Sequence, residues 1–278
     1  MNNINILIFI LYIVIFIGIV LLLLLCNKND SSKEINNDDL LEIINNSEDL
    51  NDTILFDYND CDVYLINMVK RKNRLDNFVI EFNNSDLNNK KFIIFPAIDG
   101  KEIDASKHIT DNAYQNILKS DISNVRQENL ELTRGAIGCY LSHLGVYKKI
   151  AKSNANYGLI FEDDVIINKN TLELINLNIS MIPNDWDIYL LGLVNLNSVN
   201  NNTYLDVKNF WCTHAYIIKK RSAIKLLKYL DKLFDKQIDA ELSLLVDSNK
   251  IKIYASTYNI VNQNNAKFDT DIQIPVKN

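Results

Sequence analysis

The sequence contains little glycine, proline and histidine, with 7, 3 and 3 residues among 278. It has no Gly-x-Gly-x-x-Gly, P-loop or Gly-x-Ser-x-Gly motif, which disfavours dinucleotide dehydrogenases, P-loop kinases and serine hydrolases. Its 4 cysteines lie far apart and give no zinc-site or redox-pair spacing. The formal net charge is -6 and no basic block occurs. The sequence therefore points away from these enzyme classes and from a nucleic-acid partner.

The N-terminus carries a long apolar run. Residues 4–25 have no charge and consist almost entirely of Ile, Leu, Val and Phe, about the 20 residues that a helix needs to cross a bilayer. A cleaved signal peptide would need basic residues before the run and a small-residue cleavage site, and neither is present. We therefore expect residues 1–26 to form an uncleaved transmembrane anchor. The charges that follow nearly cancel, so they leave its orientation open.

The rest of the chain divides into a polar segment and a globular part. Residues 27–60 are acidic and Asn-rich, which is typical of a stem or linker. From residue 61, apolar strand patterns alternate with helical ones, which predicts an α/β domain with a mainly parallel sheet. The predicted strands are 63–66, 92–95, 159–161, 187–192, 215–218 and 251–254, and the predicted helices are 134–153, 222–234 and 239–246.

The first of these helices has two notable features. Thr133 is its predicted N-cap. Gly135, Gly138 and Gly145 each cost a helix about 1 kcal/mol relative to Ala. We therefore expect another backbone or a ligand to approach this helix closely.

Three consecutive acids, Glu162, Asp163 and Asp164, follow an apolar strand. Ligands of α/β sheets sit at the carboxyl ends of the strands, which is where these acids fall. Adjacent carboxylates repel one another, so a bound divalent cation is the simplest way to hold them together. The alternative is a solvated acidic turn.

Other polar residues have two interpretations each. His214 precedes a strand and suits Mn²⁺ in company with carboxylates, although a lone His is more often structural. The basic residues at 70–74 would suit phosphate, or form a solvated turn. Asp239 heads a helix and is a candidate base or its N-cap. Cys139 and Cys212 lie in apolar patterns and are predicted to be small core residues.

These pieces occur in an order that resembles glycosyltransferase family 25, the lipopolysaccharide-type and collagen galactosyltransferases. The resemblance runs from about residue 62 to 273. Met68, Lys70 and Tyr147 stand where the family more often has Leu, Arg and Trp. The matching segments are 65–68 with Lys70 and Arg74, 97–101, 132–143, 159–165, 213–216, 238–239 and Gln263.

The resemblance implies a GT-A type fold and an inverting transfer of a hexose, often galactose, from a UDP-sugar. The acceptor would be a hydroxyl of a glycan, a lipopolysaccharide or a collagen-like protein. A divalent metal, Mn²⁺ with Mg²⁺ as the alternative, would hold the donor's diphosphate. It implies Asp239 as the base, and Asp164 as the metal ligand with Asp163, His214 or Glu162 helping. The implied donor-binding residues are Asn67, Lys70, Arg74, Asp99, Gly100, Ser142, His143, Glu162 and Asp163.

The expected organisation is an anchor at 1–26, a stem at 27–60 and a catalytic domain at 61–278. The domain would face the ER or Golgi lumen in a eukaryote or virus-infected host, as a type II protein, or the cytoplasm in a bacterium. Two other functions stay open. One is a catalytically silent adaptor that binds a nucleotide sugar or glycan, and the other is a metal-dependent hydrolase or nucleotidyl enzyme.

Overall fold

The computed structural model describes residues 56–126, 131–270 and 272. Contacts divide the chain into Met1–Leu41 and Glu42–Asn278, and every described residue belongs to the second unit. The predicted anchor and residues 27–55 of the predicted stem lie outside the described residues. In the described part, no helix combines the length and the apolar character needed to span a membrane.

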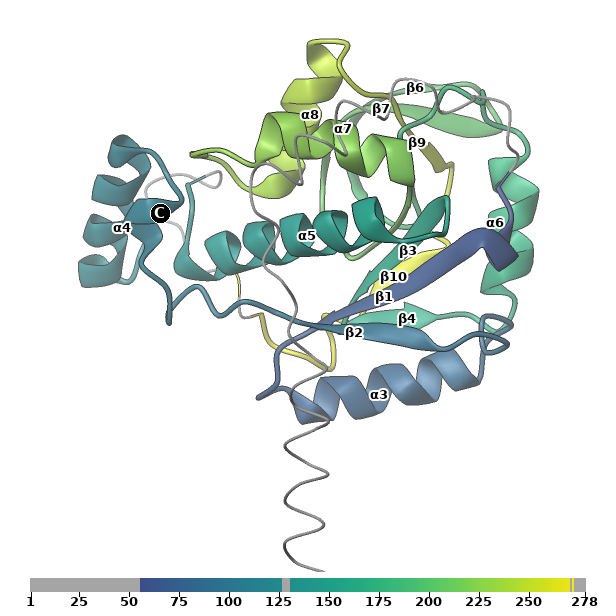
Figure 1. Ribbon diagram of the computed structural model, residues 1–278, viewed down its shortest axis with the longest axis horizontal. Helices are drawn as coiled ribbons and strands as arrows, with labels where there is room; N and C mark the ends of the chain where they lie inside the picture. The colour runs from purple at the N-terminus through teal and green to yellow at the C-terminus, as the bar shows by residue number, and fades with distance from the viewer. Residues whose placement is uncertain (1–55, 127–130, 271, 273–278) are drawn as a thin grey trace, which may run out of the picture. The chain divides into compact units, whose positions relative to one another are not determined.

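The described unit is built on an eight-stranded sheet with the order β2-β1-β3-β8-β5-β9-β7-β6 (Figure 1). Each predicted strand corresponds to a strand of this sheet. The bounds are β1 Cys61–Asn67, β2 Phe92–Pro96, β3 Tyr157–Glu162, β5 Ile188–Leu190, β6 Val194–Asn200, β7 Tyr204–Trp211, β8 Ala215–Lys219 and β9 Ile253–Ser256.

Six of the eight strands point in the same direction, which confirms a mainly parallel sheet, and β8 and β7 are the two exceptions. Strand β1 runs parallel to β2 and β3, and β5 runs parallel to β9. Strands β8 and β7 run against their neighbours, so four of the seven pairs in this sheet are antiparallel. The apolar runs identify strands because they are buried, but they carry no information about strand direction.

Helices cover both faces of the sheet, as Figure 1 shows. Helices α5 (Arg134–Lys152) and α7 (Lys220–Leu230) lie together on one face, where α5 also contacts β1 and β2. Helices α3 (Lys72–Asn83) and α6 (Thr171–Ile179) contribute to the core on the other face. Both faces of the central strands are therefore buried, which explains why these strands read as continuous apolar runs.

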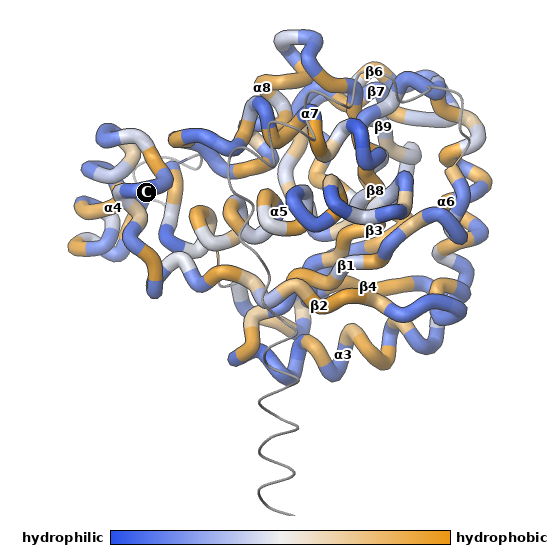
Figure 2. Tube along the Cα trace, in the orientation of Figure 1, coloured by the Kyte–Doolittle hydropathy of each residue, from blue (hydrophilic) through white to orange (hydrophobic). Residues whose placement is uncertain are grey.

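Aromatic rings fill much of the core between α3 and the sheet. Phe78 and Phe82 of α3 are buried and lie 5.7 Å apart between ring centroids. Phe78 also contacts Phe92 of β2 and Phe161 of β3 at 5.1 and 5.5 Å. Burying each such ring stabilises the fold by about 1.5–3 kcal/mol. Figure 2 shows the matching apolar colour along the central strands.

Several elements were not predicted. They are α3, α4 (Asp111–Ser123), α6, the strands β6 and β7, the two-stranded sheet of β4 (Val165–Ile167) and β10 (Val261–Gln263), and two 3-10 turns, Tyr58–Asp60 and Ala105–Lys107. Many are rich in Asn and other polar residues, so their apolar periodicity is weak.

Two predicted boundaries were wrong. The helix predicted at 222–234 ends at Leu230, and Phe234 instead stacks on Tyr140 with ring centroids 3.7 Å apart. The helix α8 (Ile238–Asp247) follows it. The strand predicted at 251–254 begins at Ile253, and it is not the last strand because β10 comes after it. Helical spacing of an apolar residue does not distinguish a helix from a loop residue that fills the same core.

Candidate active site

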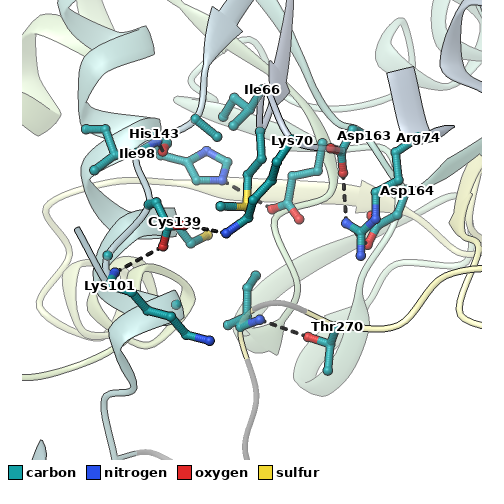
Figure 3. A pocket seen from close by; sticks show the side chains of 18 of the residues that line it. Ile66, Lys70, Arg74, Ile98, Lys101, Cys139, His143, Asp163, Asp164 and Thr270 are labelled. Atoms are coloured by element: carbon teal, nitrogen blue, oxygen red, sulfur yellow. Dashed lines mark hydrogen bonds and ion pairs between the residues drawn. The ribbon is translucent and has the colours of Figure 1, made fainter. Parts of the chain in front are cut away.

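A cleft opens where β1, β2 and β3 end. These strands are parallel, so the residues that follow them meet at one edge of the sheet. Figure 3 shows the side chains that line this cleft. The structure brings nine predicted residues to its wall: Lys70, Arg74, Asp99, Gly100, Ser142, His143, Glu162, Asp163 and Asp164.

Helix α5 holds the loop after β2 by direct backbone contact. The predicted N-cap is confirmed, because the Thr133 hydroxyl accepts a hydrogen bond from Ala136 N–H at 3.0 Å. A Cβ at Gly138 would lie 2.3 Å from the Ile98 carbonyl oxygen and 2.7 Å from Gly100 N. The expected close backbone approach is therefore found at Gly138.

Ser142 fixes the same loop from one turn further along α5. Its hydroxyl accepts a hydrogen bond from Ile98 N–H at 2.9 Å and donates to the Gly138 carbonyl at 2.6 Å. The loop then presents Asp99, which pairs with Lys70 across the mouth of the cleft. The Lys70 ammonium lowers the pKa of Asp99. Two lysines, Lys70 and Lys101, belong to the cleft wall together with Arg74.

Asp163 is fully engaged by neighbouring side chains. Its two carboxylate oxygens accept hydrogen bonds from Arg74 at 2.9 Å and from Asn67 at 2.7 Å. Burial raises the pKa of Asp163, although the Arg74 guanidinium opposes that shift. Arg74 is only 5% exposed and lies in α3, so the alternative of a solvated basic turn is wrong for this residue. Asp163 and Arg74 form a buried ion pair (Figure 3).

Asp164 has a different environment. Its Oδ2 accepts a hydrogen bond from the Gln263 amide at 3.3 Å and lies 3.5 Å from the Arg74 guanidinium. Its Oδ1 is buried and has no hydrogen-bond partner among the described residues. Burial, reinforced by the charge of Glu162, raises the pKa of Asp164 to about 7. The acids are therefore not a solvated turn.

Glu162 belongs to a buried polar network with α5 and β8. Its Oε1 lies 3.2 Å from His143 Nε2 and accepts a hydrogen bond from the Thr213 hydroxyl at 3.1 Å. Burial raises the pKa of Glu162, but the hydrogen bond and charge of His143, together with His214 and Thr213, lower the pKa overall. His143 Nδ1 lies 2.8 Å from the Tyr216 hydroxyl, which donates to Tyr147 at 2.9 Å.

His214 is placed apart from the cleft wall. It is 3% exposed, and its Nε2 contacts the Val261 carbonyl at 3.1 Å while its Nδ1 has no described partner. Burial lowers the pKa of His214. Among the described residues, His214, Asp163 and Asp164 do not form a group with ligand atoms within 4.8 Å of one another. The predicted three-residue ligand set is therefore not assembled in this structure.

A second hollow adjoins the first, and both are bounded by Cys139, Glu162, Asp164 and Gln263. It contains Asp239, whose Oδ2 accepts from Cys212 N–H at 3.1 Å and whose Oδ1 accepts from Ala240 N–H at 2.8 Å. Burial raises the pKa of Asp239. Asp239 lies in the first turn of α8 and Gln237 holds the N-cap position, so the N-cap interpretation is wrong.

Both cysteines near this junction were misassigned as core residues. Cys139 and Cys212 are only half-buried and line the second hollow. Cys212 also has a left-handed backbone, with φ of 78°. The apolar neighbours of each cysteine suggested a core position, whereas the helix face and the turn direct the thiols toward the site.

The segment after β10 completes the site and was not predicted, although Gln263, the last residue of β10, was. Arg71 forms a two-pronged ion pair with Asp269 at 3.0 and 3.1 Å, and Arg74 donates to the Asp269 carbonyl. The Arg74 guanidinium also lies 5.5 Å from the centroid of the Phe268 ring. Thr270 and Ile272 line both hollows. This polar segment has no periodic pattern, so nothing in the sequence signalled its position.

Residues 61–242 match the model of glycosyltransferase family 25 (LPS biosynthesis protein). The chain belongs to glycosyltransferase family 25. Family 25 relatives include procollagen galactosyltransferase 1-A of Xenopus laevis, 30% identical over 46% of this chain and 22% of that protein. Human procollagen galactosyltransferase 2 is 26% identical over 70% of this chain and 34% of that protein.

A bacterial relative, the lipooligosaccharide biosynthesis protein lex-1 of Haemophilus influenzae, is 29% identical over 46% of this chain and 49% of that protein. The chain thus matches between about a fifth and a half of the length of these relatives. The family 25 match covers β1 to the first half of α8, and so includes each predicted site residue.

Proposed function

We propose that this protein is a metal-dependent, inverting glycosyltransferase of the GT-A type that transfers a hexose from a UDP-sugar to an acceptor hydroxyl. The observation that carries the proposal is the pair of adjoining hollows. One holds the three acids and the cations of the strand ends, and the other holds Asp239. Two substrates that react with each other need binding sites that lie next to each other, as these hollows do.

The residues of the first hollow fit a divalent cation. Asp164 Oδ1 is buried without a described partner, and Glu162 lies in the same wall. Mg²⁺ commonly binds one or two carboxylates and takes its remaining ligands from substrate phosphates and water, and Mn²⁺ favours similar oxygen ligands. Asp164, with Glu162 helping, would hold the ion. When bound, the ion would neutralise charge on the leaving diphosphate.

The cations of this hollow have separate roles. Arg74 holds Asp163 in place through their buried ion pair, and so positions the acidic turn. Lys70 and Lys101 line the cleft on the side of the loop after β2, where they would contact donor phosphate oxygens. Asn67 does not line the cleft and supports it by donating to Asp163.

The second hollow is the proposed acceptor site. Two backbone N–H groups hold the Asp239 carboxylate in one orientation. Burial raises its pKa, which makes it a better proton acceptor. In the proposed step, the acceptor oxygen forms a bond to the anomeric carbon, the bond to UDP breaks, and Asp239 takes the hydroxyl proton. Attack from the face opposite UDP inverts the anomeric centre.

The names of the relatives suggest galactose as the donor sugar and a collagen-like or lipooligosaccharide acceptor. We also keep the N-terminal anchor as part of the proposal, since residues 4–25 are uncharged and apolar. Extraction of membranes at alkaline pH tests the anchor, because a spanning protein stays in the pellet while a peripheral one is released.

The test of the activity is a donor screen. Full-length protein in mild detergent is incubated with Mn²⁺, with one of several nucleotide sugars and with a mixture of glycan and peptide acceptors. The masses of the products are measured by mass spectrometry. The proposal predicts a hexose adduct with a UDP-sugar. UDP-sugar binding without any adduct would indicate a silent adaptor. Free sugar formed equally without acceptor would indicate a hydrolase.

A further inference from the structure

One cluster of side chains at the junction of the two hollows joins Glu162 to two residues that the proposed transfer does not use, Cys139 and His143. Cys139 Sγ, a ring nitrogen of His143 and a carboxylate oxygen of Glu162 all lie within 4.8 Å of one another. Cys139 and His143 are four residues apart in α5, so they lie on one face of the helix. Glu162 ends β3 and faces them. In the described part of the chain, this is the group of three with metal-ligand spacing.

The contacts around His143 hold its ring in one orientation. Its Nδ1 lies 2.8 Å from the Tyr216 hydroxyl, and that hydroxyl is hydrogen-bonded to Tyr147. Its Nε2 is directed at Glu162 Oε1, 3.2 Å away. The nitrogen that a metal ion would use therefore faces the carboxylate.

The polar atoms around Nε2 lie close together. His143 Nε2, Glu162 Oε1 and Thr213 Oγ1 form a triangle with sides of 3.1, 3.2 and 3.3 Å. A nitrogen and a carboxylate oxygen at this distance hold a proton between them, and a metal ion can replace that proton.

We infer that Cys139, His143 and Glu162 form a binding site for a soft divalent cation, with Zn²⁺ as its ligand. Zn²⁺ binds thiolate, imidazole and carboxylate at about 2.0–2.3 Å, which places tetrahedral ligands about 3.3–3.8 Å apart. The distance of 3.2 Å between His143 Nε2 and Glu162 Oε1 is close to that value. Binding would displace the thiol proton of Cys139 to solvent and leave the fourth position open to the hollow.

The neighbours of the cluster also fit a metal site. Metal-binding imidazoles usually donate their other N–H to a fixed acceptor, which sets the tautomer and the ring orientation. The buried hydroxyls of Tyr216 and Tyr147 supply such an arrangement for His143. Cys139 lines both hollows, so an ion has access to it.

This site shares Glu162 with the proposed donor-metal site but differs from it in its other ligands. Asp164 offers oxygen, which suits Mg²⁺ or Mn²⁺, whereas the cluster offers sulfur and nitrogen with one oxygen, which suits Zn²⁺. The inference therefore goes beyond the proposed transfer and does not depend on it. Because Glu162 borders both sites, an ion held by Cys139 would lie in the wall between donor and acceptor.

Cobalt spectroscopy tests the inference. Full-length protein carrying Cys26→Ser, which removes the cysteine outside the described residues, is titrated with Co²⁺ as a stand-in for Zn²⁺. We expect an intense near-ultraviolet charge-transfer band, which requires a thiolate ligand, and its loss on addition of Zn²⁺. Cys139→Ser should abolish the band and weaken Zn²⁺ binding at least tenfold. Cys212→Ser, a half-buried neighbour of the same hollow, should retain both.

Further variants keep the result interpretable. If Cys139→Ser proves unstable, His143→Gln takes its place as the test and should weaken Zn²⁺ binding. Circular dichroism checks that each variant is folded. Asp164→Asn should leave the band unchanged, which separates this site from the proposed donor-metal site. Absence of the band in the Cys26→Ser parent protein, or its persistence in Cys139→Ser, would overturn the inference. The cation at Nε2 would then be a proton, shared in an ion pair of His143 with Glu162.

Discussion

At the residue scale, the three adjacent acids have three different environments. Glu162 is paired with His143, Asp163 is bound by Arg74 and Asn67, and Asp164 keeps one buried oxygen without a described partner. A strand end turns successive side chains in different directions, so neighbours in sequence meet different groups. Stability and activity should therefore depend on different members of the triplet.

Exchanging each aspartate for asparagine tests this division. We expect Asp163→Asn to lower the free energy of unfolding by about 3 kcal/mol, because Arg74 would lose its buried ionic partner. Asp164→Asn should change it by less than about 1 kcal/mol and lower kcat for transfer at least 100-fold, as expected for loss of a metal-ligand oxygen. Denaturant titration and initial rates measure both. A large loss of stability in Asp164→Asn, with transfer retained, would reverse the two roles.

Asp239 gives a prediction in pH. A general base works when deprotonated, so its activity is present above its pKa and is lost as pH falls through it. Burial raises the pKa of Asp239, so the acid limb of kcat/KM should lie above the ordinary aspartate value of about 3.9. Asp239→Asn should lower kcat by about 10²–10⁴ and remove that limb.

The matched control is Asp247→Asn, at the exposed end of the same helix α8. It should leave the rate and the pH profile unchanged. An unchanged acid limb in Asp239→Asn would assign the base to another group.

At the element scale, helix α5 organises the site. Its N-cap, its apolar face and the close approach at Gly138 were all predictable, because they follow from local sequence rules. The contact partner of Gly138 was not predictable, since it lies in the loop after β2, about 40 residues earlier. Local patterns give the elements, and the long-range contacts that close the cleft appear only in the structure.

Two glycines of α5 test the importance of this backbone contact. A Cβ at Gly138 would meet the backbone of the loop, whereas a Cβ at Gly145 would meet the half-buried ring of Phe95 at 2.2 Å. Because the Phe95 side chain can swing aside and a fixed backbone cannot, Gly138→Ala should raise the donor KM at least tenfold and cost about 2 kcal/mol of stability. Gly145→Ala should leave the donor KM within about twofold. Equal effects on KM would show that the loop does not position the donor.

At the scale of the whole molecule, the sequence allowed prediction of the α/β class, of the strands of the central sheet except β6 and β7, and of a cleft at their carboxyl ends. It did not show the segment after β10, which borders both hollows through Thr270 and Ile272. That segment is held by ion pairs and single contacts to α3 rather than by apolar periodicity. The exposure of Cys139 and Cys212 was missed for the same reason, because a pocket leaves no periodic pattern.

A buried lysine should make the free energy of unfolding depend on pH. Lys219, at the end of β8, donates to the Asn184 carbonyl at 2.5 Å and lies 4.4 Å from the centroid of the Trp186 ring. Burial lowers its pKa from 10.5 to about 8. Below about pH 8, Lys219 is protonated in both the folded and the unfolded state, and the folded state carries the full free-energy cost of the buried charge. Above it the unfolded state binds more protons, so the free energy of unfolding should rise.

Denaturant titrations at pH 7, 8 and 9 measure this dependence. The rise should be smaller in Lys219→Met than in the wild type, and Lys228→Met, which removes an exposed lysine of the next helix, should keep the wild-type slope. Identical slopes in all three proteins would show that Lys219 does not titrate in this range.

The most direct test of the proposed function is a side-by-side assay of wild-type and Asp164→Asn protein with UDP-galactose and acceptor, with Mn²⁺ and with a chelator. The account predicts a galactosylated product from the wild type with Mn²⁺, and at least 100-fold less product after chelation or in Asp164→Asn. Product formed equally with the chelator, or equally by Asp164→Asn, would contradict a metal held at Asp164 in a glycosyl-transfer site.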